Sequence, residues 1–421
     1  MVSVLSSLFS SSKLSTQIET LRAAESGLVS FAKKFGKQGS SSVTIFDTHI
    51  PRSSVPIINN ECMLFKDKKK DDDTYIIHGV HVSSDDLDNP GKKGEDEIPL
   101  VLMHGYCNGA LYFYRNLCGL SNHFKSVYSI DMFGWGLSSR PPFRTQDKSV
   151  ESAEAVFVES LEAWRYENGI EKMILGGHSM GGYYAVAYCE KYPERVEKLF
   201  LISPVGVPHL EGEHTVENAS LTARTAFGLV KTFWRNNITP GSVMRTLSES
   251  RGRNLVRSYL DRRIPAITSE EEKKVLHEYM YTNNILPGSG EFALNRVLKP
   301  IAYARKPTIY RIPKLKVPKV TFIYGAQDWM DPIGGHDVKQ KCEEYGNNAP
   351  HVKVYTVRDA GHLMFLENWE EFNAAMIVAD DGELPLGSPV PREFDPSLNR
   401  PLRWDQPKTE RDRDNKTPSP A

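Results

Sequence analysis

From Ile98 onward, short apolar segments alternate with helical stretches, and this alternation restricts the fold more than any other feature of the sequence. Six segments are rich in branched and aromatic residues, as strands buried on both faces of a sheet are: IPLVLMH, SVYSIDM, KMILGG, KLFLISP, KVTFIYG and VKVYTV. Helical stretches at 149–167, 181–192 and 337–346 lie between them. Strands that alternate with helices predict an α/β fold with a mostly parallel, doubly wound sheet.

The alternation breaks between residues 207 and 315, which show no clear strand pattern and are expected to be helical. We interpret this segment as a helical cap inserted after the strand segment KLFLISP. The cap then divides the α/β core into a first part at 41–206 and a second part at 316–380. A Pro-rich tail follows at 381–421, and its mixed charge predicts an extended or disordered segment.

Residues 1–40 form a separate segment ahead of the core. Between Leu14 and Phe35 the apolar residues recur at spacings of three, four and seven, which is typical of one face of a helix. Two interpretations stay open: the helix packs on its own domain, or it is an amphipathic or targeting element that touches lipid. The first eighteen residues lack the continuous apolar segment of a secretory signal. They also lack the arginines of a mitochondrial transit peptide, and that targeting role stays open.

Charge and cysteine content exclude several classes of protein. The chain has 52 Lys and Arg against 53 Asp and Glu, a formal charge of −1. A protein that binds the backbone of nucleic acids needs an excess of basic residues, so no nucleic-acid partner is expected. No apolar run reaches the ~18 residues that cross a bilayer. The five cysteines form no CxxC pair, and His209 and His214 lie in a polar loop, so we expect no metal site.

The strongest chemical signal is the segment Gly177-His178-Ser179-Met180-Gly181, which follows an apolar strand and precedes a helix. A G-x-S-x-G pattern in this context is typical of a nucleophile elbow. The sharp turn strains the serine backbone, and the small residues on both sides allow strand and helix to pack closely. Ser179 is therefore the candidate nucleophile.

A serine hydroxyl is a poor nucleophile at neutral pH and needs a base and an acid that orients the base. Asp328 follows the strand segment KVTFIYG, and His362 follows VKVYTV. Both therefore lie at the carboxyl ends of strands, where open α/β sheets place their sites. We predict His362 as the base and Asp328 as the acid, with Asp331 and Asp359 as rival acids.

An oxyanion formed at the attacked carbonyl needs two backbone N–H donors. Met180, directly after the nucleophile, is one candidate donor. The other is expected in the glycine-containing loop at 104–109, where Tyr106 and Cys107 stay open as alternatives.

Beyond these positions, the chain resembles the α/β-hydrolase subfamily that contains α/β-hydrolase domain proteins four and five and their plant and fungal acyltransferase and lipase relatives. The resemblance covers about residues 14–379. It rests on these segments: LRAAES, HGYCNGALYFYRNL, SIDMFGWGLSSRP, GGHSMGGYYAVAYCEKYPERVEKLFLISPVGVP, EYMYTNN, YARKPTIYRI, YGAQDWMD and AGHLMFLENWEEF.

The resemblance implies an α/β-hydrolase fold with a helical cap, and glycerolipid chemistry at a membrane or lipid-droplet surface. Family members hydrolyse acyl phospholipids, transfer acyl groups to lysophosphatidic acid, or act as lipase co-activators. By motif, the nucleophile, acid and base carry over onto Ser179, Asp328 and His362.

The sequence departs from this family at two points. The family motif associated with acyl transfer has His and Asp separated by four residues, and here Glu367 stands in the Asp position after His362. Its carboxylate also fits a plainer role at the start of the last helix, where the dipole favours negative charge. The co-activator branch lacks the nucleophile and carries an N-terminal Trp-rich lipid anchor, whereas this chain keeps Ser179 and has no Trp before Trp135.

The predicted cap is basic and apolar in its first half. The stretch from Arg224 to Arg263 contains nine basic residues and two acidic ones. The apolar residues Phe227, Phe233 and Trp234 are interspersed with them. Such a surface suits phosphate headgroups at a membrane, and a solvated helical face is the alternative.

The sequence as a whole favours a serine acyl hydrolase that acts on acyl glycerophospholipids. The alternatives are a lysophosphatidic acid acyltransferase that makes phosphatidic acid and a non-catalytic lipid-droplet lipase co-activator. We expect no cofactor, with acyl-CoA as co-substrate in the acyltransferase alternative. The expected location is intracellular, cytoplasmic with peripheral association with lipid droplets or membranes, and a mitochondrial location stays open.

Overall fold

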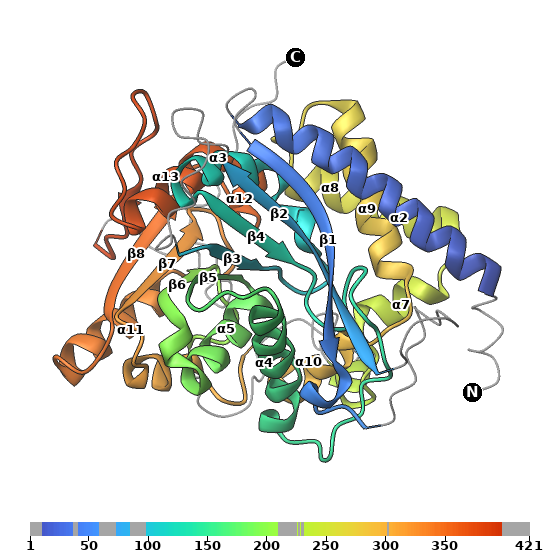
Figure 1. The fold of residues 1–421 in the computed structure, drawn as a ribbon, viewed down its shortest axis with the longest axis horizontal. Helices are drawn as coiled ribbons and strands as arrows, with labels where there is room; N and C mark the ends of the chain where they lie inside the picture. Colours follow the sequence, from blue (N-terminus) through green and yellow to red (C-terminus); the bar gives the residue numbers. More distant parts are fainter. Residues whose placement is uncertain are drawn as a thin grey trace.

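The computed structural model of the chain describes residues 11–36, 41–58, 73–84, 98–208, 225, 228, 231–300 and 303–397 (Figure 1). His209 and His214, and residues 398–421 of the predicted tail, lie outside the described residues.

In the described part of the chain, nine strands form a single sheet with the order β1-β2-β4-β3-β5-β6-β7-β8-β9. The strands are β1 (Ser41–Pro51), β2 (Thr74–Ser84), β3 (Leu100–Met103), β4 (Ser126–Ile130), β5 (Met173–His178), β6 (Val196–Ile202), β7 (Lys319–Gly325), β8 (His351–Val357) and β9 (Arg392–Glu393). The six strands from β3 to β8 pair in parallel, and β1, β2 and β9 join antiparallel. The predicted mostly parallel sheet is confirmed, and its six parallel strands coincide with the six apolar segments.

Helices cover both faces of this sheet. The helices of the core are α2 (Ser11–Ala32), α3 (Tyr114–Phe124), α4 (Val150–Glu167), α5 (Met180–Lys191), α11 (Ile333–Tyr345), α12 (Met364–Glu367) and α13 (Trp369–Ala379). Short 3₁₀ turns are η1 (Lys33–Phe35), η2 (Arg52–Ser54), η3 (Ala110–Phe113) and η4 (Pro193–Arg195). Figure 1 shows α3 and α13 on one side of the sheet and α4, α5 and α11 on the other. Every residue of β3 and β5 is buried, as a strand between two helical layers requires.

The segment between β6 and β7 is mostly helical in its described residues, with loops between the helices. It contains α7 (Pro240–Thr246), α8 (Glu249–Arg263), α9 (Glu270–Ile285), η5 (Gly290–Ala293), α10 (Leu294–Val297), η7 (Thr308–Tyr310) and η8 (Ile312–Lys314). A single antiparallel bridge joins Leu298 and Ala304. This content agrees with a helical insertion, while the exact boundaries of the cap stay a prediction.

The N-terminal helix α2 packs against other helices of the chain. It lies along α9 and also contacts α3 (Figure 1). Leu21 and Leu28 on its apolar face have no exposed surface. Of the two interpretations of this helix, the structure therefore favours packing within its own domain, because the face that would touch lipid is already buried.

Part of the predicted C-terminal tail is attached to the sheet. Residues Arg392 and Glu393 form β9, which pairs with Tyr355 and Thr356 of β8. Phe394, directly after β9, is buried. The segment is extended as expected, and the pairing with β8 orders this part of it.

No helix of the described residues is both long and apolar enough to cross a bilayer.

A buried charge network joins α2 to the first two strands. The Nδ1 of His78 on β2 is 2.6 Å from Oδ1 of Asp47, and its Nε2 is 3.2 Å from Oε2 of Glu25. Burial alone would lower the pKa of His78, but the two carboxylate hydrogen bonds raise it to about 10. At neutral pH the ring is therefore an imidazolium that donates both protons.

Glu25, His78 and Asp131 also bring three ligand-type atoms within 4.8 Å of one another. A protonated imidazole has no lone pair for a metal. The two oxygens of Asp131 accept hydrogen bonds from the backbone N–H groups of Ala110 and Leu137, at 2.7 and 2.8 Å. We therefore interpret the cluster as a structural charge network that fixes α2 and the loops after β3 and β4.

We predict that Glu25→Gln destabilises the protein, because it weakens a buried hydrogen bond to a cation that is worth about 1–3 kcal/mol. The raised pKa of His78 gives stability that is complete below its ordinary value of 6.5 and is lost as the pH rises through about 10. The melting temperature of the parent should therefore fall between pH 7 and 10, and that of Glu25→Gln should fall less. Thermal unfolding across this range checks the prediction.

Glu171 is exposed, so Glu171→Gln is the matched control and should melt like the parent at each pH. A Glu25→Gln curve that follows the parent at every pH would show that the network does not stabilise the fold.

Candidate active site

Ser179 lies in the sharp turn between β5 and α5. Its backbone has φ +53° and ψ −113°, a conformation that L residues with a side chain rarely adopt. A Cβ on Gly177 would lie 2.5 Å from the carbonyl oxygen of Gly181, and a Cβ on Gly181 would lie 2.5 Å from that of His104. The glycines of the motif are therefore required by close backbone packing, and the resulting turn is that of a nucleophile elbow.

The structure brings the three predicted triad residues into one chain of hydrogen bonds. Nε2 of His362 lies 3.2 Å from Oγ of Ser179, and Nδ1 lies 3.1 Å from Oδ1 of Asp328. The side chain of Asp328 has no exposed surface, and that of His362 is 17% exposed. The residues come from three loops, which follow β5, β7 and β8 at the carboxyl edge of the sheet.

The two rival acids have other surroundings. Oδ1 of Asp331 accepts a hydrogen bond of 2.9 Å from the N–H of Ile333, at the start of α11. Asp359 is exposed and lies in a turn with φ +50°. Asp328 is thus the one of the three acids whose carboxylate accepts a hydrogen bond from His362.

Ser203, at the end of β6, is a further member of this group that the sequence analysis missed. Its Oγ hydrogen-bonds Oδ2 of Asp328 and lies 2.9 Å from Nδ1 of His362. The signal was present in the sequence, since Ser203 follows an apolar strand just as Asp328 and His362 do.

Two side chains hold the loop that carries His362. The carboxylate of Glu367 accepts hydrogen bonds from the backbone N–H groups of Gly361, at 3.0 Å, and Leu363, at 3.2 Å. Nε2 of His178 donates to the carbonyl oxygen of His362, at 3.0 Å. Burial lowers the pKa of His178 well below its usual range, so its ring is neutral. Glu367 therefore contacts the backbone on both sides of His362, which is a positioning geometry.

The predicted oxyanion loop runs beside the nucleophile. A Cβ on Gly105 would lie 3.0 Å from Cβ of Ser179, so the backbone just before Tyr106 passes close to the serine. Met180 is the first residue of α5, and its N–H has no acceptor earlier in the helix. Cys107 has φ +60°, and its carbonyl oxygen accepts a hydrogen bond of 3.1 Å from Nδ2 of Asn284. Burial raises the pKa of the Cys107 thiol, which keeps it protonated.

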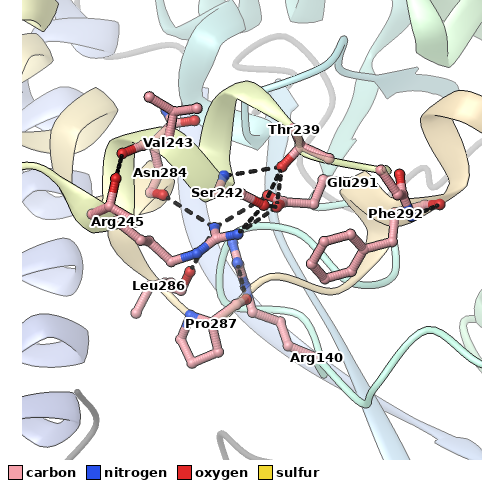
Figure 2. Close-up of polar contacts among 12 residues, drawn as sticks. Arg140, Thr239, Ser242, Val243, Arg245, Asn284, Leu286, Pro287, Glu291 and Phe292 are labelled. Atoms are coloured by element: carbon pink, nitrogen blue, oxygen red, sulfur yellow. Dashed lines mark hydrogen bonds and ion pairs between the residues drawn. The ribbon is translucent and has the colours of Figure 1, made fainter. Parts of the chain in front are cut away.

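The cap is joined to this loop by buried polar contacts. Nδ2 of Asn283 on α9 donates to the carbonyl oxygen of Asn108, at 2.8 Å. Arg140 is buried and donates to the carbonyl oxygens of Pro287 and Asn283, at 2.7 and 3.3 Å. Figure 2 shows Arg140 beside the ion pair between Arg245 and Glu291, which links α7 to η5. The cap is thus anchored, through Asn108, to the loop that runs beside Ser179.

Three comparisons relate the chain to known proteins. A family model described as "alpha/beta hydrolase fold" matches residues 98–368. A 1-acylglycerol-3-phosphate O-acyltransferase of Arabidopsis thaliana is 35% identical over 288 residues, which cover 66% of this chain and 66% of that protein. A (lyso)-N-acylphosphatidylethanolamine lipase of Mus musculus is 34% identical over 285 residues, 67% of this chain and 79% of the relative.

Among solved structures, a bacterial membrane phospholipase A described as a virulence factor matches with a TM-score of 0.52. It is 17% identical and covers 87% of this chain and 91% of its own. At this identity the match supports the fold alone.

We predict that Ser179 reacts with a fluorophosphonate probe, because a base lies within hydrogen-bonding distance of its hydroxyl. Ser179→Ala should abolish labelling. Asp328→Asn should slow it by about 10³-fold or more, since the imidazole loses its orienting carboxylate. The labelling rate, read by gel fluorescence, measures both effects.

Asp331→Asn is the matched control and should label at the parent rate. Equal slowing by both Asn variants would contradict the assignment of Asp328 as the orienting acid.

Proposed function

The chain belongs to the α/β-hydrolase fold family, and we propose that within it the protein is a serine acyl hydrolase that acts on acyl glycerophospholipids. The chain of hydrogen bonds from Ser179 through His362 to Asp328 carries this proposal. The relatives add the substrate class, because their names describe an acyltransferase that uses an acylglycerol phosphate and a lipase that cleaves an N-acyl phospholipid.

In the proposed reaction, Oγ of Ser179 attacks the acyl carbonyl while Nε2 of His362 takes the hydroxyl proton. Asp328 holds the ring in the tautomer that accepts at Nε2 and stabilises the imidazolium that forms. The N–H of Met180 and that of Tyr106 or Cys107 stabilise the oxyanion. The leaving group departs with the proton from His362, and an acyl-enzyme remains.

Hydrolysis and acyl transfer differ in the acceptor of this acyl group. Water gives the free acid, whereas the hydroxyl of a lysophospholipid gives a diacyl product, with acyl-CoA as an acyl donor that loads the serine. The acyltransferase activity is our second candidate, and the name of the Arabidopsis relative favours it. A non-catalytic co-activator is disfavoured by Ser179 and its hydrogen bond to His362.

Glu367 bears on this choice, since its position matches the acyl-transfer motif in the resembled family. Both of its oxygens already accept backbone hydrogen bonds. Burial raises the pKa of its carboxyl, and these two donors oppose that effect. We therefore propose that Glu367 orders the loop of His362 for either acceptor and does not itself act on the acyl group.

We predict that Ser179→Ala abolishes both hydrolysis of acyl phospholipids and acyl-CoA-dependent transfer to lysophosphatidic acid. Glu367→Gln should lower both activities by the same factor, about tenfold, because an amide presents only one acceptor oxygen to two N–H donors. Purified protein assayed with each substrate set by lipid mass spectrometry measures the two rates.

Survival of both activities in Ser179→Ala would refute the proposed mechanism. Loss of transfer alone in Glu367→Gln would assign that carboxylate a direct role in acyl transfer. Glu370→Gln, at an exposed residue three positions further along the chain, is the matched control and should keep both activities.

A surface on cap helix α8 supports a membrane-facing substrate. Leu255 and Tyr259 are one helical turn apart, and the two residues are 48% and 36% exposed. Exposed arginines accompany them at Arg251, Arg257, Arg262 and Arg263. Within the described residues no ion pair is recorded for these four, whereas Arg253 pairs with Glu249 and Glu278. An exposed helix with apolar and unneutralised basic residues fits an anionic lipid interface.

We predict that Arg257→Glu with Arg262→Glu lowers binding to vesicles that contain phosphatidic acid by about tenfold or more, at about 1 kcal/mol per basic residue. Vesicle flotation measures the bound fraction. Lys316→Glu is the matched control, because this exposed residue precedes β7 and lies at the opposite end of the strands from Ser179.

Neutral phosphatidylcholine vesicles should not distinguish the arginine variant from the parent. Equal binding of both proteins to the anionic vesicles would remove α8 as the membrane-facing surface.

A further inference from the structure

The hydroxyl of Ser203 occupies the space between the candidate acid and base. Its Oγ hydrogen-bonds Oδ2 of Asp328 and lies 2.9 Å from Nδ1 of His362, while Oδ1 of Asp328 lies 3.1 Å from the same nitrogen. Ser203 has no exposed surface. Nδ1 of the imidazole therefore has two oxygen neighbours at nearly equal distance, one from each residue.

The hydrogens can be placed by counting donors. A hydroxyl has one proton and a carboxylate has none, so the Ser203 proton lies on the hydrogen bond to Asp328. The Ser203 oxygen is then free to accept from the imidazole. The proton on Nδ1 of His362 is shared between the Ser203 oxygen and Oδ1 of Asp328.

The backbone holds this hydroxyl in place at a conformational cost. Ser203 has φ +44° and is followed by Pro204, in a conformation that residues with a Cβ rarely adopt. Its N–H donates to the carbonyl oxygen of Ile323 on β7, at 2.8 Å, which continues the pairing between β6 and β7. Strained backbone at a functional site commonly positions a side chain that the chemistry uses.

We propose that Ser203 is a positioning residue for the reaction, in which its hydroxyl acts through Asp328 to orient and stabilise His362. This inference rests on the proposed serine acyl hydrolase function, in which Ser179 is the nucleophile. As the imidazolium forms, the Ser203 oxygen offers its Nδ1–H a second acceptor. The proton that Ser203 donates to Asp328 keeps that oxygen turned toward the ring. No bond to Ser203 forms or breaks.

The test compares Ser203→Ala and Ser203→Gly in the hydrolysis of p-nitrophenyl butyrate. Both variants lack the hydroxyl, but glycine accepts φ +44° without strain and alanine does not. If the hydroxyl positions His362, both variants should lose about tenfold to a hundredfold in kcat. KM should stay unchanged, because the Ser203 hydroxyl does not touch the substrate. Parent-like kcat in Ser203→Gly would assign the effect to the backbone and overturn the proposal.

A double-mutant cycle with Asp328→Asn separates positioning from a general structural role. Since the hydrogen bond to the Asp328 carboxylate keeps the Ser203 oxygen turned toward the ring, removal of the hydroxyl should cost less than about threefold in the Asp328→Asn background. The same large loss in both backgrounds would overturn the proposal. Ser160→Ala removes a buried hydroxyl that donates to the carbonyl oxygen of Phe157, at 3.1 Å, and this control should leave kcat unchanged.

Ser179→Ala in the same assay separates the proposed function from the role of Ser203. If Ser179→Ala keeps the parent rate, the proposed function itself has failed. If Ser179→Ala is inactive while both Ser203 variants keep the parent kcat, the proposed function stands and the role of Ser203 is refuted.

Discussion

The candidate site depends on one backbone constraint, the left-handed conformation of Ser179 between β5 and α5. That turn is held by glycines on both sides, where a Cβ would overlap backbone atoms of α5 or of the loop after β3. It directs the serine hydroxyl away from the sheet and toward the loops that follow β7 and β8. Because those strands are parallel to β5, their carboxyl ends meet at the same edge, and a base and an acid can reach the serine.

Burial then decides the protonation of the groups around this edge. His104 and His178 are buried and hydrogen-bond to backbone carbonyl oxygens, so the pKa of His104 falls to about 4 and that of His178 lies well below its usual range, and both rings serve as neutral hydrogen-bonding links. His78 is also buried, yet carboxylates at both ring nitrogens make it a cation. Buried histidines of this protein are thus neutral or cationic, depending on their hydrogen-bond partners. His362 differs from these buried histidines, because its ring is partly exposed and its Nε2 lies within hydrogen-bonding distance of Ser179. It is therefore the histidine placed to take the serine proton.

The sequence predicted much of this arrangement because its signals are local. Apolar segments identify the six parallel strands, and the loops after β5, β7 and β8 mark the edge where Ser179, Asp328 and His362 meet. Ser203 occupies an equivalent position after β6 but carries no motif, so only its contacts with Asp328 and His362 reveal it. Glu367 was identified by spacing from His362, but its contacts with the N–H groups on both sides of that histidine required coordinates.

By itself, the sequence determined the fold class and the candidate nucleophile, since strand periodicity and the glycines around Ser179 act over a few residues. The tertiary structure decided which of three acids faces the candidate base His362, because Asp328, Asp331 and Asp359 have similar local signals and differ in where the backbone directs them. It also decided that the apolar face of α2 packs on α9, a contact between residues about 250 positions apart. Long-range packing of this kind depends on which surfaces remain uncovered after the sheet forms, and no short stretch of sequence contains that information.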